Sequence, residues 1–254
     1  MQTLFKKTAA RDILTGHALF LDIDGTLLEL APSPEAVEVP HTLVPVLQQL
    51  ADRLGGAIAF VSGRTIEAID ALFNPLKLPA VGVHGGEVRT PDGLILADSG
   101  LVDEIQATEP LLREAIGGMR GVVLENKHSA IALHYRSVPE RGREVLKVAE
   151  LVVGGMGSQF AVLMGKCVVE IRPRHQTKGI AIDQLMRMAP FRGRTPIFAG
   201  DDCTDEDAFE VVNRLGGVSV HVGSSSGTQA HHRLASPDQL RGWLQQLSDN
   251  RADE

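Results

Sequence analysis

The sequence predicts an α/β protein, in which a core built on a parallel β-sheet carries an inserted α+β cap. Short, continuously apolar segments alternate with helical periods toward both ends of the chain, whereas segments in the middle alternate apolar and polar residues. Continuous apolar runs are typical of parallel strands buried on both faces, and alternation is typical of antiparallel strands with one exposed face. A chain of 254 residues with 43% hydrophobic side chains can bury the cores of two compact units.

Strands and helices of the expected core follow one another in order. The apolar segments predict strands at residues 18–21, 57–61, 196–199 and 218–222. Apolar residues at helical spacing predict helices at residues 42–54, 65–73, 177–188 and 205–214. Such alternation of strand and helix is typical of α/β proteins.

A different pattern occupies the middle of the chain. We expect a hairpin with its turn at Pro91, Asp92 and Gly93, then a helix at 102–116, and then the order strand, strand, helix, strand, strand. The segments SAIALHYR and KCVVEIRP both alternate as half-buried antiparallel strands do. These patterns divide the chain into core residues 1–86, cap residues 87–172 and core residues 173–254.

Composition limits the partners and the compartment. The formal net charge is −7 and no basic run occurs, so we expect no nucleic-acid partner. Two cysteines, Cys167 and Cys203, form no disulfide framework and favour a reducing compartment. Neither a secretory leader nor an apolar run of about 18 residues is visible, so we expect a cytoplasmic protein without a membrane partner. The oligomeric state is left open.

Polar residues follow the predicted core strands. Ligands of open parallel sheets bind beyond the carboxyl ends of the strands. The residues found there are Asp22, Asp24 and Thr26 after the first strand, Ser62 and Arg64 after the second, and Asp201 and Asp202 after a later one. We therefore expect the functional site at this edge of the sheet.

The carboxylates at this edge predict a metal ion. Asp22, Asp24, Asp201 and Asp202 would crowd together, and like charges in close quarters raise one another's pKa unless a cation neutralises them. Oxygen ligands from carboxylates are typical of Mg²⁺, whereas the histidines and cysteines lack zinc spacing. The sequence thus predicts Mg²⁺ as the cofactor.

A hydroxyl and an ammonium predict binding of an anion. Ser62 lies at a strand end, directly before a predicted helix whose N-terminal amides favour negative charge. Lys178 lies in the first turn of a helix, where its charge opposes the helix dipole, and Gly179 weakens the helix further. Positions that break local preferences often belong to functional sites. Together with magnesium, these residues predict a site for phosphoryl transfer.

Four short motifs resemble those of the haloacid dehalogenase (HAD) superfamily of phosphatases, in the same order. They are Asp22-Ile-Asp-Gly-Thr-Leu27, Ser62, Lys178 and Gly200-Asp-Asp-Cys-Thr-Asp-Glu206. More narrowly, segments such as LDIDGTLLELAPSPEAVEVP, GVHGGEVR and ENKHSAIALHYR resemble the trehalose-6-phosphate phosphatases over most of the chain. This resemblance implies a Rossmann-like core with an inserted cap. It also implies a small sugar phosphate as substrate, in the last step of trehalose biosynthesis.

The resemblance also implies the role of each core residue. Asp22 would attack phosphorus to give an aspartyl-phosphate, and Asp24 would protonate the departing sugar oxygen and then deprotonate the attacking water. Ser62 and Lys178 would hold the phosphoryl group, and Thr26 would steady the first loop. The implied metal site consists of Asp22, the backbone carbonyl of Asp24, Asp201 and Asp202, with Asp205 in support.

Substrate recognition is expected from residues of the cap. The resemblance implies that polar residues of the cap strands bind sugar hydroxyls, and the matching residues are Glu125, Lys127, Lys166 and Glu170. Arg64 and Glu87 are expected to add to this set from the core side. Closure of the cap over the core would exclude bulk water and bring Asp24 to the leaving oxygen.

Other interpretations stay open at this point. An aspartate at a strand end is often only a turn former, and Glu206 and Asp207 suit the acidic first turn of a capped helix. The polar residues of the cap could be a solvated sheet face. The protein could act on another sugar phosphate, because the core motifs are shared across the superfamily. It could also be a phospho-accepting regulatory module, although an intact Asp24 argues for hydrolysis.

Overall fold

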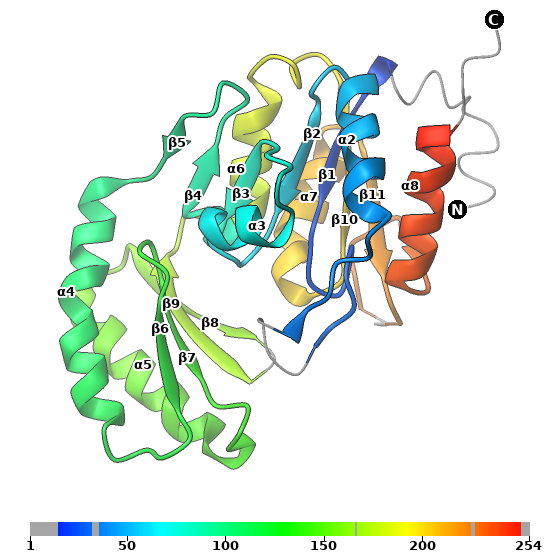
Figure 1. Ribbon diagram of the computed structural model, residues 1–254. Coiled ribbons are helices and arrows are strands. Elements are labelled where there is room, and N and C mark those ends of the chain that lie inside the picture. The colour runs from blue at the N-terminus through cyan, green and yellow to red at the C-terminus, as the bar shows by residue number, and fades with distance from the viewer. Residues whose placement is uncertain (1–14, 32–35, 166, 225–226, 250–254) are drawn as a thin grey trace, which may run out of the picture. The chain divides into compact units, whose positions relative to one another are not determined.

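A computed structural model describes residues 15–31, 36–165, 167–224 and 227–249 (Figure 1). The chain divides into two compact units, Met1–Ile95 with Lys178–Glu254 and Leu96–Thr177. We call them the core unit and the inserted unit. Both boundaries lie farther along the chain than predicted. The predicted hairpin at residues 87–97 is the reason for the first shift, because its strands join the core sheet instead of the inserted unit.

The core unit is built on an eight-stranded sheet with the order β12-β11-β10-β1-β2-β3-β4-β5. Its strands are β1 His17–Leu21, β2 Ile58–Val61, β3 Ala80–Gly82, β4 Glu87–Arg89, β5 Ile95–Leu96, β10 Thr195–Gly200, β11 Val218–Val222 and β12 His232–Leu234. The strands from β12 to β3 pair in parallel, and β4 pairs antiparallel to β3. The predicted α/β class with a mostly parallel sheet is thereby confirmed.

Register within this sheet determines where the functional residues lie. Leu21 of β1 aligns with Phe60 of β2 and with Ala199 of β10. The three strands run in the same direction, so the residues after them emerge at one edge of the sheet. The loops that begin at Asp22, Ser62 and Asp201 are therefore neighbours, as the sequence predicted.

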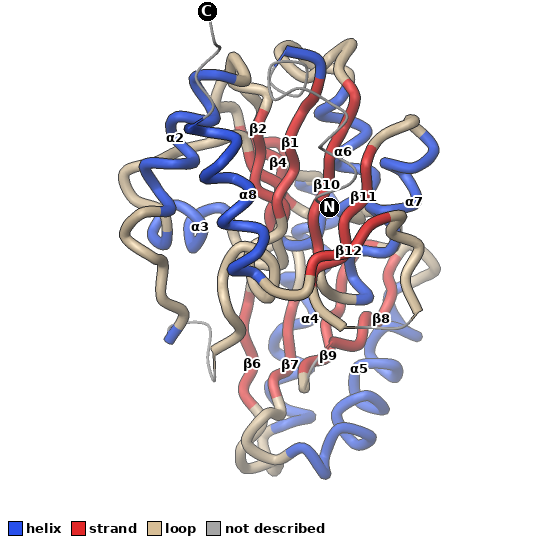
Figure 2. The backbone as a smooth tube through the Cα atoms, turned by 90° about the vertical axis from the view of Figure 1, so that its right-hand side faces the viewer, coloured by secondary structure: helices blue, strands red, loops and turns tan. Residues whose placement is uncertain are grey.

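Helices cover both faces of the core sheet. They are α2 Leu43–Arg53, α3 Ile66–Leu72, α6 Lys178–Met186, α7 Glu206–Arg214 and α8 Pro237–Asp249. Figure 2 shows α2 and α8 on one side of the sheet and α6 and α7 on the other. Among the described residues, no helix is both long and apolar enough to cross a membrane.

Local sequence explains these elements. Every residue of β2 is buried, as expected for a strand covered on both faces. In α2, the buried residues Leu43, Val46, Leu47 and Leu50 recur at the spacing of one helical face. Helix α3 begins after Thr65, whose hydroxyl accepts the backbone N–H of Ala68 at 3.2 Å. The strands β3 and β12 and the helix α8 were not among the predicted elements.

The inserted unit is an antiparallel sheet packed against two helices. Its elements are α4 Ser99–Ile116, β6 Val123–Asn126, β7 Ile131–His134, α5 Gly142–Met156, β8 Phe160–Gly165 and β9 Val168–Pro173, and the strand order is β6-β7-β9-β8. Ile131 and Leu133 of β7 and Ile171 of β9 pack with Ile105 and Leu112 of α4. This hydrophobic core is separate from that of the core unit.

The other face of this sheet carries polar side chains. Ala132 of β7 lies directly between Glu125 of β6 and Glu170 of β9 in the register of the sheet. Residues directly opposite one another share a face, whereas their neighbours Ile131 and Leu133 point to the helices. Glu125 and Glu170 therefore flank Ala132 on the face opposite the hydrophobic core of this unit.

Two adjacent leucines of α4 test the separate core of the inserted unit. Leu112 is fully buried, whereas Leu111 is 57% exposed. We expect Leu112→Ala to destabilise this unit by about 2–5 kcal/mol, because it leaves a cavity, and Leu111→Ala to change stability by less than about 0.5 kcal/mol. Hydrogen exchange of the β7 and β9 amides measures both effects. Equal exchange in the two variants would contradict the packing described here.

Candidate active site

The loop after β1 is a tight turn that brings Asp22 and Thr26 to the sheet edge. The carbonyl oxygen of Ile23 accepts the backbone N–H groups of Thr26, Leu27 and Leu28 at 3.3, 3.0 and 2.9 Å. Gly25 has a φ of +88°, and a Cβ at this position would lie 2.2 Å from Oδ2 of Asp201. Only glycine combines this backbone conformation with so close an approach. The turn thereby places the first loop against Asp201.

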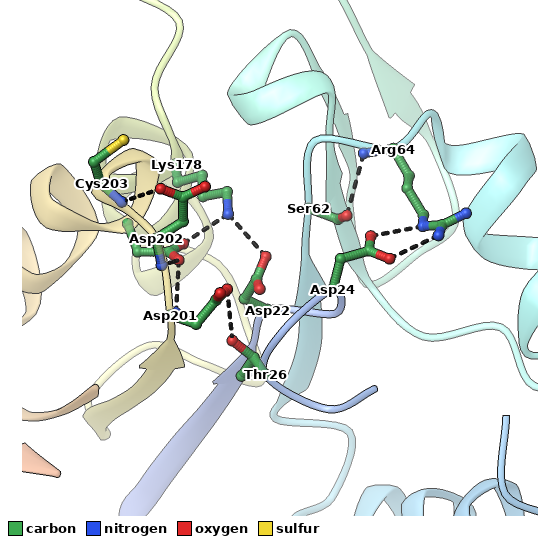
Figure 3. A network of polar contacts seen from close by, with 10 residues as sticks. Asp22, Asp24, Thr26, Ser62, Arg64, Lys178, Asp201, Asp202 and Cys203 are labelled. Carbon is green, nitrogen blue, oxygen red and sulfur yellow. Dashed lines mark hydrogen bonds and ion pairs between the residues drawn. The ribbon is translucent and has the colours of Figure 1, made fainter. Parts of the chain in front are cut away.

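Lys178 is the centre of the site (Figure 3). Its ammonium donates to Oδ1 of Asp22 at 2.8 Å and to Oδ1 of Asp205 at 2.6 Å. All three residues are buried, with exposed fractions of 3%, 4% and 0%. Charged groups persist in such a place only when they are paired, as these are. The structure thus joins Asp22 and Lys178, which the sequence predicted as catalytic residues.

These contacts shift the pKa values of both predicted catalytic residues. Burial raises the pKa of the Asp22 carboxyl well above its usual range; the Lys178 ammonium opposes this shift, and the carboxylates of Asp205 and Asp201 add to it. Burial by itself would lower the pKa of Lys178, but the carboxylates of Asp205 and Asp22 hold it above the ordinary value for a lysine. Three carboxyl groups, those of Asp22, Asp201 and Asp205, thus surround a single ammonium.

Asp205 also organises the loop after β10. Its Oδ2 accepts the backbone N–H groups of Asp201 and Asp202, both at 3.0 Å. The hydroxyl of Thr26 donates to Oδ1 of Asp201 at 3.4 Å, which connects this loop with the one after β1. Thr26 therefore links the two loops through this hydrogen bond.

The residues present fit a hard divalent cation. One carboxylate oxygen each from Asp22, Asp201 and Asp205 lies within 4.8 Å of the others. An all-oxygen donor set with excess negative charge is typical of a Mg²⁺ site. Both oxygens of Asp205 are already engaged by Lys178 and the loop amides, so Asp205 is better suited to support the site than to bind the ion.

Asp202 and Asp24 differ from the simplest metal prediction. The carboxylate of Asp202 accepts the backbone N–H of Cys203 at the start of a 3₁₀ turn, and it is not part of the three-carboxylate group. The carboxylate of Asp24 is turned to Arg64 instead of to Asp22 (Figure 3). Of the four residues predicted to bind metal, Asp22 and Asp201 are thus the two whose carboxylates meet.

Arg64 holds Asp24 in a two-point ion pair. Nε of Arg64 donates to Oδ2 of Asp24, and Nη2 donates to Oδ1, both at 2.7 Å. Such planar pairing is specific to arginine and fixes the orientation of the carboxylate. Ser62 is 1% exposed, and its Oγ accepts the backbone N–H of Arg64 at 3.1 Å. The sequence predicted both residues at the site but not this pairing.

A turn after β3 supports the loop that carries Ser62. Val83 and His84 have φ values of 48° and 53°, which are strained for residues with a Cβ. The backbone N–H of Val83 donates to the carbonyl of Arg64 at 2.9 Å, and that of His84 donates to the carbonyl of Ser62 at 3.0 Å. This support was missed from the sequence, where the glycines of GVHGGE were the available signal.

Glu87 has a backbone partner that its predicted role did not include. It was expected to bind substrate, but its Oε2 accepts the backbone N–H of Ile66 at 3.0 Å, in the first turn of α3. Negative charge at a helix N-terminus is favourable. Glu87 therefore steadies the loop of residues 62–66 from β4.

Three of the polar residues predicted in the cap form one cluster in the inserted unit. Lys127 lies 2.5 Å from Oε1 of Glu170 and 4.0 Å from Oε2 of Glu125. Lys127 and Glu170 are buried, so they are not a solvated sheet face. A hydrogen bond from His134, at 2.7 Å, lowers the pKa of Glu125. Lys166, the fourth member of the prediction, lies outside the described residues.

Comparisons with known proteins identify the family. A family model for trehalose-phosphatase matches residues 20–239. The chain is 40% identical to trehalose-6-phosphate phosphatase of Escherichia coli, over 97% of the chain and 95% of that protein. It is 42% identical to a probable trehalose-phosphate phosphatase of Sinorhizobium fredii, over 92% of the chain and 89% of that protein.

Solved structures have the same fold. A trehalose-6-phosphate phosphatase related protein is 25% identical, with a TM-score of 0.73 over 91% of this chain and 96% of that one. The C-terminal domain of trehalose-6-phosphate phosphatase from Candida albicans is 20% identical, with a TM-score of 0.80 over 94% of this chain and 96% of that one. The chain therefore belongs to the trehalose-phosphatase family of the HAD superfamily, a family of phosphoric monoester hydrolases.

Proposed function

We propose that this protein hydrolyses trehalose 6-phosphate to trehalose and phosphate, with Mg²⁺ as cofactor and through an aspartyl-phosphate on Asp22. The observation that carries the proposal is the buried cluster in which Lys178 contacts Asp22 and Asp205, next to Asp201. The names of relatives that are 40% and 42% identical over most of the chain support the substrate.

In the first step, Asp22 is the nucleophile. A carboxylate oxygen of Asp22 attacks phosphorus while the bond from phosphorus to the sugar oxygen breaks, and Asp24 gives its proton to that oxygen. Lys178 contacts the Asp22 carboxylate and balances negative charge on the phosphoryl group, and Ser62 binds a phosphoryl oxygen through its hydroxyl. The products of this step are trehalose and phosphorylated Asp22.

In the second step, water releases phosphate. Asp24, now a carboxylate, takes a proton from a water molecule that attacks phosphorus, and the bond from phosphorus to Asp22 breaks. In the structure Asp24 is paired with Arg64, so this pair has to open or shift before Asp24 reaches the sugar oxygen. The regulatory-module alternative would lack this second step, because it needs a stable phospho-aspartate.

Asp22, Asp201 and the backbone carbonyl of Asp24 would hold Mg²⁺, and Asp205 and Asp202 would support them. When bound, the ion supplies positive charge that offsets the charge developing on the phosphoryl oxygens. Burial and the neighbouring carboxylates raise the pKa of Asp22, and a cation beside it would lower that pKa and favour the carboxylate that attacks phosphorus. A bound cation would also account for the three carboxylates that meet around the single ammonium of Lys178.

Glu125, Lys127 and Glu170 would bind sugar hydroxyls. A buried ion pair such as Lys127–Glu170 is weak evidence for stability, since apolar residues of the same size pack as well. Its charged groups can, however, donate and accept strong hydrogen bonds. We therefore infer that this cluster selects the disaccharide, together with Lys166.

Phosphate release from several sugar phosphates tests the function. We expect turnover of trehalose 6-phosphate, little turnover of the 6-phosphates of sucrose and glucose, and loss of all turnover in EDTA that excess Mg²⁺ restores. Turnover of a different sugar phosphate would contradict the proposed substrate but not the proposed chemistry of the core residues. No turnover of any phosphate ester would contradict the proposal and favour the regulatory module.

Replacement of the nucleophile tests the intermediate. We expect Asp22→Asn to abolish turnover and leave the fold intact, because an amide cannot attack phosphorus. Asp183→Asn is the matched control, since Asp183 of α6 pairs with Arg187 at the surface, away from the cluster. Steady-state assays and circular dichroism measure both variants. Retention of more than a few percent activity in Asp22→Asn would show that Asp22 is not the nucleophile.

The polar cluster of the inserted unit predicts that a substitution in it affects a substrate with the sugar more than one without it. Glu170→Gln keeps the side-chain size but removes the charge, so we expect about tenfold or greater loss of kcat/KM for trehalose 6-phosphate. For p-nitrophenyl phosphate, which has no sugar, we expect a change of less than about twofold. Glu150→Gln, on the exposed side of α5, is the control. Equal losses on both substrates would mean that Glu170 acts through folding.

A further inference from the structure

The start of helix α6 is held by a side chain of helix α7. Oδ2 of Asp207 accepts the backbone N–H of Gly179 at 2.8 Å. The two helices lie side by side in the core unit (Figures 1 and 2). A Cβ at Gly179 would lie 2.5 Å from the carbonyl oxygen of Asp207 and 2.8 Å from Cγ2 of Val211. The first turn of α6 is therefore packed directly on α7, and Gly179 is required for this approach.

Two carboxylates two residues apart contact two successive residues of α6. Asp205 binds the ammonium of Lys178, and Asp207 binds the backbone of Gly179. The first contact fixes the end of the lysine side chain, and the second fixes the main chain beside its Cα. Together they restrict both ends of a long side chain that would otherwise have many rotamers.

Asp207 offers a hydrogen-bond acceptor that holds the backbone at this helix end, and its charge suits the same place. An ammonium in the first turn of a helix opposes the helix dipole, and a glycine next to it lowers helix stability. A carboxylate at the same end offsets both effects, because it is favoured by the dipole and accepts a backbone N–H there. The unusual position of Lys178 is thus compensated by Asp207.

We propose that Asp207 is a positioning residue for Lys178, acting through the hydrogen bond to Gly179. This inference rests on the proposed function, in which Lys178 contacts the nucleophile and the phosphoryl group. Asp207 does not contact these groups itself. It keeps the first turn of α6 at the place from which the Lys178 ammonium reaches Asp22.

The test compares variants that differ in the acceptor. Asp207→Ala removes it, and we expect kcat for trehalose 6-phosphate to fall by about tenfold or more, because small displacements of an aligned group are costly. Inhibition by orthovanadate, which resembles the transferring phosphoryl group, should weaken in parallel. Asp207→Asn keeps an acceptor oxygen, and we expect it to stay within about threefold of the unchanged protein in both measurements.

A matched control separates positioning from stability. Glu206 lies in the same turn of α7, and its carboxylate also accepts one backbone N–H, that of Gln229 at 2.7 Å. We expect Glu206→Ala to lower the melting temperature by a few degrees, as loss of a cap does, without a change in kcat or vanadate inhibition. If Asp207→Ala does not fold, Asp207→Glu keeps the charge but displaces the acceptor by one methylene, and it should lose activity in the same way.

The results distinguish this inference from the proposed function. If Lys178→Met is inactive, and Asp207→Ala loses kcat and vanadate inhibition while Asp207→Asn and Glu206→Ala do not, both the proposed role of Lys178 and the inference hold. An Asp207→Ala variant as active as Glu206→Ala would overturn the inference alone, as would equal losses in Asp207→Asn and Asp207→Ala. A fully active Lys178→Met would overturn the proposed role of Lys178 and the inference with it.

Discussion

Burial of one ammonium group constrains the rest of the site. Lys178 is almost inaccessible to water, so its charge has to be balanced by carboxylates that are equally buried. Asp22 comes from the end of β1 and Asp205 from the turn after β10, and both have to converge on the start of α6. The parallel register of β1 and β10 makes this convergence possible, because it brings both strand ends to the same edge. The order of the central strands is thus a requirement of the charge pairing.

A second regularity is that carboxylates hold the backbone at three places around the site, namely the loop after β10 and the starts of α3 and α6. Asp205 accepts two amides of the loop after β10, Glu87 accepts the first turn of α3, and Asp207 accepts the first turn of α6. Loops that bind anions offer backbone N–H groups, and the amides not used for the ligand need acceptors. Side chains from neighbouring elements supply these acceptors. The backbone of these loops is thus held by carboxylate acceptors that belong to the chain itself.

Much of the core and the site could be predicted from the sequence, because strand ends and helix starts are local patterns. The apolar runs located β1, β2, β10 and β11, and the residues after three of them gave Asp22, Ser62 and Asp201. The turn residues Pro91, Asp92 and Gly93 predicted a hairpin at residues 87–97 but not which sheet it joins, since a hairpin can extend either sheet. The pairing of Arg64 with Asp24 and the backbone contact of Glu87 depend on side-chain conformations across loops, which no local pattern encodes.

The inserted unit is one continuous segment, Leu96–Thr177, and this has a consequence for how such proteins diversify. A contiguous segment with its own hydrophobic core can be exchanged as a block by a single recombination event, while the nucleophile and its partners stay unchanged. The two junctions are not equivalent, however. The first lies within the two-residue strand β5 at the end of the core sheet, whereas the second is directly followed by Lys178. A change of length at the second junction would therefore displace Lys178 from Asp22, whereas one at the first junction would fall at the end of the sheet, away from this contact in the sequence.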